Sequence, residues 1–132
     1  MRQTLLAAVV LAALIAPASA QSEMDPKLVR LFEIATDPTP FYGTRQEVRC
    51  AMYGANLTLA FCAVFNQAGQ GVGMFPISTR RLSAEDRTHA VANCAGREPS
   101  PACVADITAD VVEDYGSASL RELDVTWVDL SQ

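Results

Sequence analysis

The chain of 132 residues lacks both an excess of basic residues and a long apolar run. It contains 10 Lys and Arg against 15 Asp and Glu, which gives a formal net charge of −5. Binding to nucleic acids is driven largely by clustered Lys and Arg that displace counterions from phosphates. The longest apolar run, residues 5–16, has twelve residues, whereas a membrane-spanning helix needs about 20. We therefore expect no nucleic-acid partner and no membrane span in the mature protein.

The sequence also has few residues that could form a catalytic or metal centre. His89 is the only histidine, and the cysteines include no C-x₂₋₄-C pair of the kind that binds zinc. The glycine-rich stretch 69–73 lacks the G-x-G-x-x-G spacing of dinucleotide-binding loops and is expected to be a hairpin loop. P-loop, G-x-S-x-G and H-E-x-x-H motifs are absent. We expect no metal, no cofactor, a surface position for His89 and a protein that is not an enzyme.

The first 20 residues have the three parts of an export signal. Arg2 gives the positive start, residues 5–16 form the apolar centre, and Pro17 precedes the small-x-small triplet that ends at Ala20. Cleavage is predicted after Ala20, with release of a mature protein into the bacterial periplasm or outside the cell. The alternative, a membrane anchor, is disfavoured because the apolar centre is too short.

All four cysteines lie in the predicted mature part. An even number of cysteines in an oxidising compartment indicates two disulfides, and four cysteines allow three pairings. We favour the pairs that close short loops, Cys50–Cys62 and Cys94–Cys103. Each bridge would stabilise the domain by about 2–4 kcal/mol.

The first half of the mature chain predicts one helix and a set of strands. Asp25 and Pro26 are typical of an N-cap and a first helical residue, so a helix is expected over 26–36. Alternating or continuous apolar residues then indicate three strands, near 46–53, 57–65 and 72–77. The third is expected at an edge or a strand end, because it contains Pro76, which cannot donate to a ladder.

A hairpin centred on Asn56 would join the first two strands and place Cys50 opposite Cys62. This register turns both cysteines away from the bulky face of the second strand, which contains Leu57, Leu59 and Phe61. If that face alone formed the core, the favoured pairing would be wrong.

The second half predicts a helix followed by two strands. Ser83 and the acids after it are typical of a capping box, so a helix is expected over 84–95. Residues 102–113 fit either a strand or a helix. A strand is favoured because residues 123–127 alternate in the same way after a turn at 115–117. The inner face expected for the helix is small and consists of Ala84, Thr88, Val91 and Ala95.

The expected element order is one helix, three strands, a second helix and two strands. A small five-stranded barrel of the OB-fold type has its helix between strands three and four, so the order resembles that fold over about residues 45–130. The alternative is one layer of helix on an antiparallel sheet. The predicted organisation is a signal peptide (1–20), an N-terminal helix with a proline-rich link (21–44) and one disulfide-bonded domain (45–130).

A ligand-binding face is expected where arginines and aromatic side chains meet. In an OB-fold, strands two and three carry the usual ligand face, and arginine with aromatic rings can bind an oligosaccharide, a peptide or a nucleic-acid strand. The overall negative charge disfavours the last of these. The candidate residues are Tyr42, Tyr53, Phe75, Arg80 and Arg81.

These patterns favour an exported, non-enzymatic binding or interaction module, whose partner is an envelope protein or a small ligand. Two alternatives remain open. One is a small secreted hydrolase that uses dispersed carboxylates. The other is an acidic inhibitor of a cationic secreted enzyme, because residues 106–129 contain seven acids and a single base, Arg121.

Overall fold

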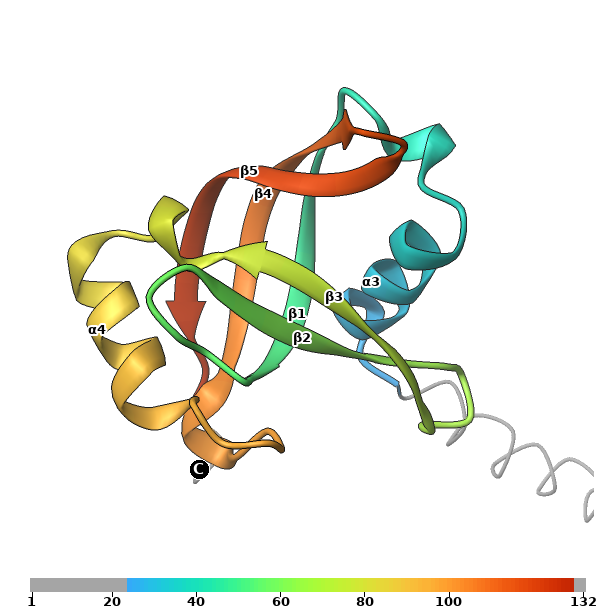
Figure 1. The fold of residues 1–132 in the computed structure, drawn as a ribbon. Helices are drawn as coiled ribbons and strands as arrows, with labels where there is room; N and C mark the ends of the chain where they lie inside the picture. The colour runs from blue at the N-terminus through green and yellow to red at the C-terminus, as the bar shows by residue number, and fades with distance from the viewer. Residues whose placement is uncertain (1–23, 130–132) are drawn as a thin grey trace, which may run out of the picture.

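The computed structural model describes residues 24–129, and the predicted export signal lies outside them. This part of the chain has an α+β fold with two α-helices and one antiparallel sheet in the order β3-β2-β1-β4-β5 (Figure 1). Three short 3₁₀ turns connect these elements. The helices are α3 (Pro26–Thr36) and α4 (Ala84–Asn93), the strands are β1 (Arg45–Tyr53), β2 (Leu59–Phe65), β3 (Gly71–Ser78), β4 (Val104–Asp114) and β5 (Ser117–Trp127), and the turns are η1 (Thr39–Phe41), η2 (Thr79–Arg81) and η3 (Pro101–Cys103).

Local chemistry determines both ends of α3. The Asp25 carboxylate accepts a hydrogen bond from the backbone N–H of Lys27 at 2.7 Å, and Pro26 at the first position has no N–H to satisfy. The helix ends at Thr36, just before the residue that precedes Pro38, because that residue avoids the helical conformation. The prediction of a helix over 26–36 is confirmed.

Strand β1 is shared between two parts of the sheet. Its residues Arg45 to Ala51 pair with β4, whereas β2 pairs with β1 only at Ala51 to Tyr53. The first half of β1 therefore has a strand neighbour on one side, and α3 lies against β1 and β2 (Figure 1). The edge strands β3 and β5 contact each other without forming a ladder. The sheet is thus open, and the expected closed barrel is not shown.

The core lies between the inner face of the sheet and α3, and it uses the less bulky face of β2. Ala60, Cys62 and Val64 are buried, whereas Leu59 and Phe61 on the other face are only half-buried. The concern that the bulky face of β2 forms the core is therefore wrong. Among the described residues, the largest fully buried apolar side chains besides the cysteines are Leu31, Ile34, Val48, Met52, Ile107 and Val111.

The hairpin between β1 and β2 differs in register from the expectation. Met52, and not Cys50, lies opposite Cys62, so the hairpin is centred on residue 57. The Asn56 side chain accepts hydrogen bonds from the backbone N–H groups of Thr58 and Leu59, which closes a loop one residue further along the chain. Cys50 therefore faces Cys62 diagonally, on the same side of the sheet.

Helix α4 has the expected cap and a different inner face. Ser83 accepts a hydrogen bond from the backbone N–H of Asp86 at 3.1 Å, as predicted. However, Ala84, Thr88 and Ala95 are exposed, and the buried residue of the helix is Ala90, with Cys94 buried at its C-cap. The expected inner face is wrong: Ala90 faces the core, and so does Cys94 one turn later, which is bridged to Cys103.

Strand pairing decides the conformation of residues 102–113. Residues 104–113 belong to β4, which pairs with β1 on one side and β5 on the other, so the strand prediction is confirmed for them, whereas residues 102 and 103 lie in η3. Tyr115 and Gly116 make the turn to β5 with φ values of 52° and 84°. The register shifts between Thr108 and Asp110, close to Glu122, which has a φ of 55°.

Candidate functional site

The two cysteine pairs at disulfide distance are those that the loop lengths favour. Cys50 and Cys62 join β1 to β2 with a Cα–Cα distance of 4.8 Å, and Cys94 and Cys103 join the end of α4 to η3 at 5.6 Å. All four side chains are buried. Both bridges are therefore structural parts of the core rather than exposed reactive groups.

The five residues proposed as a ligand face are spread over several surfaces. Tyr53 pairs with Phe61 on the outer side of the sheet, and their rings are 5.8 Å apart. Phe75 pairs with Cys62 and is buried on the inner side. Tyr42 follows η1 and packs half-buried against the core. The structure thus does not bring these three aromatic rings to one face.

Arg80 and Arg81 are exposed in η2, directly after β3. They line a groove of 770 Å³ together with Arg45, Asp110, Glu122 and Asp124. Asp110 is bound there by Arg45 at 3.0 Å. This groove is charged throughout, apart from Leu123, and it contains none of the three candidate aromatic residues.

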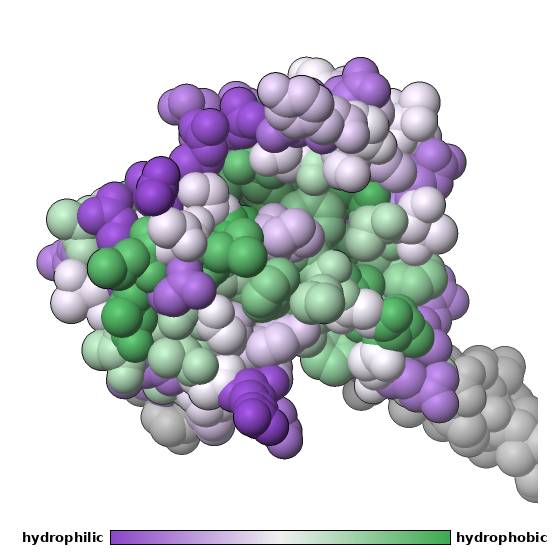
Figure 2. Space-filling view, in the orientation of Figure 1, coloured by the Kyte–Doolittle hydropathy of each residue, from purple (hydrophilic) through white to green (hydrophobic). Residues whose placement is uncertain are grey.

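A different surface stands out: the outer side of β2, β3 and the end of β1. Met74 is 59% exposed and its neighbour Val72 is 52% exposed. Figure 2 shows apolar side chains extending across this side of the molecule below a hydrophilic rim. We call it the outer apolar face and define it by residues that alternate to one side of the three strands: Tyr53, Leu59, Phe61, Ala63, Phe65, Met74 and Pro76.

The sequence contains a signal for this surface. The stretch 50–79 contains no charged residue, although 19% of the whole chain is charged. Edge strands of soluble proteins commonly carry charges that prevent pairing with other chains. The uncharged edge strand β3 is therefore unusual in an otherwise acidic protein.

Two grooves border β3, one on each side of the sheet. The outer groove, of 430 Å³, is lined by Tyr53, Phe65, Met74 and Arg97, among others. The edge groove, of 330 Å³, lies between β3, α3 and the β4–β5 turn. Met74 lines both grooves. Representative residues of the edge groove are Ile34, Ala35, Phe75, Pro76 and Ala118.

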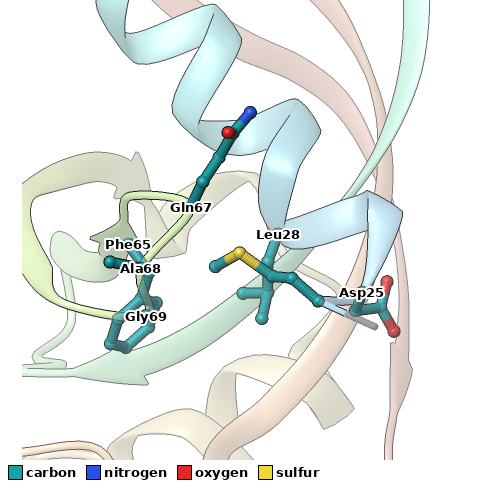
Figure 3. Close-up of a pocket in the computed structure, with 7 residues that line it drawn as sticks. Asp25, Leu28, Phe65, Gln67, Ala68 and Gly69 are labelled. Atoms are coloured by element: carbon teal, nitrogen blue, oxygen red, sulfur yellow. The ribbon is translucent and has the colours of Figure 1, made fainter. Parts of the chain in front are cut away.

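A fourth groove, of 970 Å³, separates the start of α3 from the β2–β3 turn. Figure 3 shows Leu28 of α3 across the groove from the turn residues Phe65 to Gly69, while the carboxylate of Asp25, the N-cap of α3, points away from them. The carboxylate of Asp25 already caps α3 and binds Arg49 at 2.9 Å. This groove therefore offers little polar chemistry beyond the amide of Gln67.

An ion-pair cluster fastens α3 to the outer side of β1 and β4. Asp106 accepts hydrogen bonds from Arg49 at 2.8 and 3.1 Å and from Lys27 at 2.8 Å. The hydrogen bonds from Arg49, helped by those from Lys27 and opposed by burial, hold the pKa of Asp106 below its usual value. The same bonds raise the pKa of Lys27 and of Arg49. The cluster is satisfied by its own members and is best explained as a structural clamp.

His89 was expected at the surface, and the structure gives its ring specific partners. Its ring lies 4.1 Å from the ring of Trp127, and its Nε2 is 2.9 Å from the carbonyl oxygen of Ala102. The Trp127 indole N–H donates to the carboxylate of Asp86 at 3.0 Å. These contacts attach α4 to the end of β5. His89 is therefore half-buried rather than a free surface side chain.

The acids of residues 106–129 do not form one uninterrupted acidic surface. Asp106, Asp110 and Asp114 are each paired with an arginine. Within residues 24–129, no group of three or more His, Cys, Asp and Glu side chains is placed to hold a metal ion.

No family model, curated protein or solved structure matches this chain. In the part of the chain that the structure describes, no helix is both long and apolar enough to cross a membrane.

Proposed function

We propose that this chain is an exported binding module of the bacterial periplasm or envelope, which recognises a partner protein through the outer apolar face. The observation that carries the proposal is this exposed, uncharged surface on β2 and β3. Large exposed apolar patches commonly mark sites of protein interaction. The predicted signal peptide and two buried disulfides support an oxidising location.

The finer fold assignment also belongs to this proposal. Helix α4 lies between β3 and β4, and the edge strands β3 and β5 contact each other. A partly open, five-stranded barrel of the OB-fold type has this arrangement. We propose that the open sheet is such a barrel, with its ligand-binding surface on the outer side of β2 and β3.

The inhibitor alternative is less well supported. It requires free acidic side chains that face one cationic partner, and three of the seven acids are ion-paired within the chain. No particular contact favours the hydrolase alternative.

A cross-linked pull-down tests the proposed function. The oxidised chain 21–132 would be used as bait with envelope extract from the source organism, beside the variants Met74→Glu and Thr126→Glu. Both variants add one negative charge at an exposed strand position, the first on the outer apolar face and the second on β5. We expect a protein that the unmodified chain and Thr126→Glu capture and Met74→Glu does not. Capture of the same proteins by all three baits, or by none, would contradict the proposal.

A further inference from the structure

The hydrogen bonds of β3 show which of its main-chain groups are free. The backbone N–H of Thr79 donates to the carbonyl of Thr58, so this pair is hydrogen-bonded directly across the ladder. In an antiparallel ladder hydrogen-bonded and non-hydrogen-bonded pairs alternate. The N–H and C=O groups of Met74 and the C=O of Pro76 therefore point away from β2. Pro76, which has no N–H, occupies a position where none is needed.

These free groups lie between the two grooves that border β3. In a strand added to an edge, side chains alternate between the two sides of the sheet. A strand paired with β3 beside Met74 would direct successive side chains alternately to the outer side of the sheet, where Met74 borders the outer groove, and to the inner side, where the edge groove lies. Main-chain bonds with side-chain pockets on alternate sides are the features by which sheet edges bind extended peptides.

The surroundings of the edge favour a single extended segment over a second copy of the chain. Residues Ile34 and Ala35 of α3 and Ala118 at the start of β5 stand on the inner side of the edge. A second copy would bring its own α3 and β4–β5 turn to the space that these elements occupy. An extended segment brings no helix or turn to this inner side, and only every second side chain of the segment points there.

Charge indicates part of the segment's sequence. Arg97 lines the outer groove and takes part in none of the ion pairs found within residues 24–129. Among the described residues, no acidic side chain lines the outer or the edge groove. A carboxylate on the outer side of an added strand would therefore find a cation and no repelling charge.

We propose that the free edge of β3 binds an extended polypeptide segment as an additional strand. Its apolar side chains enter the edge groove, and a carboxylate beside them faces Arg97. This inference rests on the proposed function, because it specifies how the partner protein is bound and which chemistry it presents.

Selection from a displayed library of random peptides tests the inference. We expect enriched sequences that alternate apolar residues and include an acid. A synthetic copy of the enriched peptide should bind about tenfold more weakly to Met74→Pro, which lacks the free N–H, than to Met74→Ala, which keeps it. Leu57→Ser, which changes an exposed apolar residue outside both grooves, serves as the control and should bind normally.

Peptide variants keep the test decisive if Met74→Pro does not fold. N-methylation of one alternate set of peptide amides should abolish binding, and methylation of the other set should not, because only one set faces β3. Arg97→Gln should weaken the binding of the acid-containing peptide about fivefold. The same peptide with its Glu replaced by Gln should bind Arg97→Gln and the unmodified chain equally well.

An equal loss of binding on methylation of either set of amides would overturn the proposed strand addition. A library that yields no binder would overturn it as well. If the pull-down still captured a protein that depends on Met74, the proposed function would stand without it. If Met74→Glu also had no effect in the pull-down, both would fail.

Discussion

At the scale of single residues, the Asp106 carboxylate is the centre of the ion-pair cluster between α3, β1 and β4. It receives hydrogen bonds from Lys27 of α3 and from Arg49 of β1, while its own backbone belongs to β4. One carboxylate thus links three elements that are far apart in the sequence. Exposed ion pairs contribute little to stability, but this carboxylate is largely buried and accepts several charged hydrogen bonds at once.

Asp106→Asn should lower the free energy of unfolding by about 1–2 kcal/mol at neutral pH. The pKa of Asp106 is lowered in the folded state, so its contribution is present above the unfolded pKa of about 3.9 and is lost as the pH falls through the folded value. Urea unfolding at neutral and acidic pH would measure the free energy of unfolding of both proteins. The difference in this free energy between Asp106→Asn and the unmodified chain should shrink in acid. Asp110→Asn, which removes an exposed pair with Arg45, is the control with little effect at either pH. Equal losses for both variants would contradict the assigned role.

At the scale of elements, β3 is hydrogen-bonded to β2 along one edge, and it contacts β5 without forming a ladder. The alternation of its hydrogen bonds follows from the Thr58–Thr79 pair and from the register with β2. Phe75 and Ile77 direct their N–H groups toward β2, whereas the N–H of Met74 points away.

Hydrogen exchange should therefore alternate along β3. In the isolated protein we expect the Met74 amide to exchange faster than those of Phe75 and Ile77 by a factor of about 100 or more. Exchange followed by nuclear magnetic resonance would measure each amide separately. Equal protection of Met74 and its neighbours would show that the edge is covered, and the peptide-binding inference would then lose its basis.

Elements also show what the sequence could and could not predict. Both α-helices begin where Asp25 and Ser83 accept bonds from nearby backbone N–H groups, and such contacts are local enough to predict. The inner face of β2 was not predictable from side-chain size, because the bridge at Cys62 draws its smaller face into the core. The register of the β1–β2 hairpin depends on how the Asn56 side chain closes its loop.

The candidate site was harder to predict than the strands. Tyr53 and Phe75 both lie in correctly predicted strands, yet alternation places them on opposite sides of one sheet. Which side is outer depends on long-range packing, and so does the position of Arg97 beside the outer apolar face. The absence of charge from residues 50–79 was visible in the sequence, and Pro76 predicted an edge position or a strand end for the third strand. Only the fold shows which side chains of this stretch lie together on the outer apolar face.

At the scale of the whole molecule, the two disulfides hold different parts of the fold. One lies within the sheet, and the other attaches α4 to the start of β4. A domain of this size has a limited core and gains much of its stability from such bonds.

Replacing either pair by alanines, Cys50→Ala with Cys62→Ala or Cys94→Ala with Cys103→Ala, should lower the free energy of unfolding by about 2–3 kcal/mol. Removing both pairs should leave a barely stable protein, since small domains have only about 5–15 kcal/mol in total. Urea unfolding of the three variants would measure the losses. Because the sulfurs are buried, a reducing agent without denaturant should act only slowly on the unmodified protein. Stabilities that match the unmodified chain would contradict the structural role of the bridges.

The order of the cysteines bears on how the chain would mature during export. The first cysteine of the chain pairs with the second and the third with the fourth, so neither loop encloses the other. In a nascent chain that emerges N-terminus first, as the signal sequence predicts, Cys62 would appear while Cys50 is the only thiol present. An oxidase that joins cysteines in order of appearance would thus make both native bonds directly. Maturation should therefore depend on an oxidase and not on a disulfide isomerase.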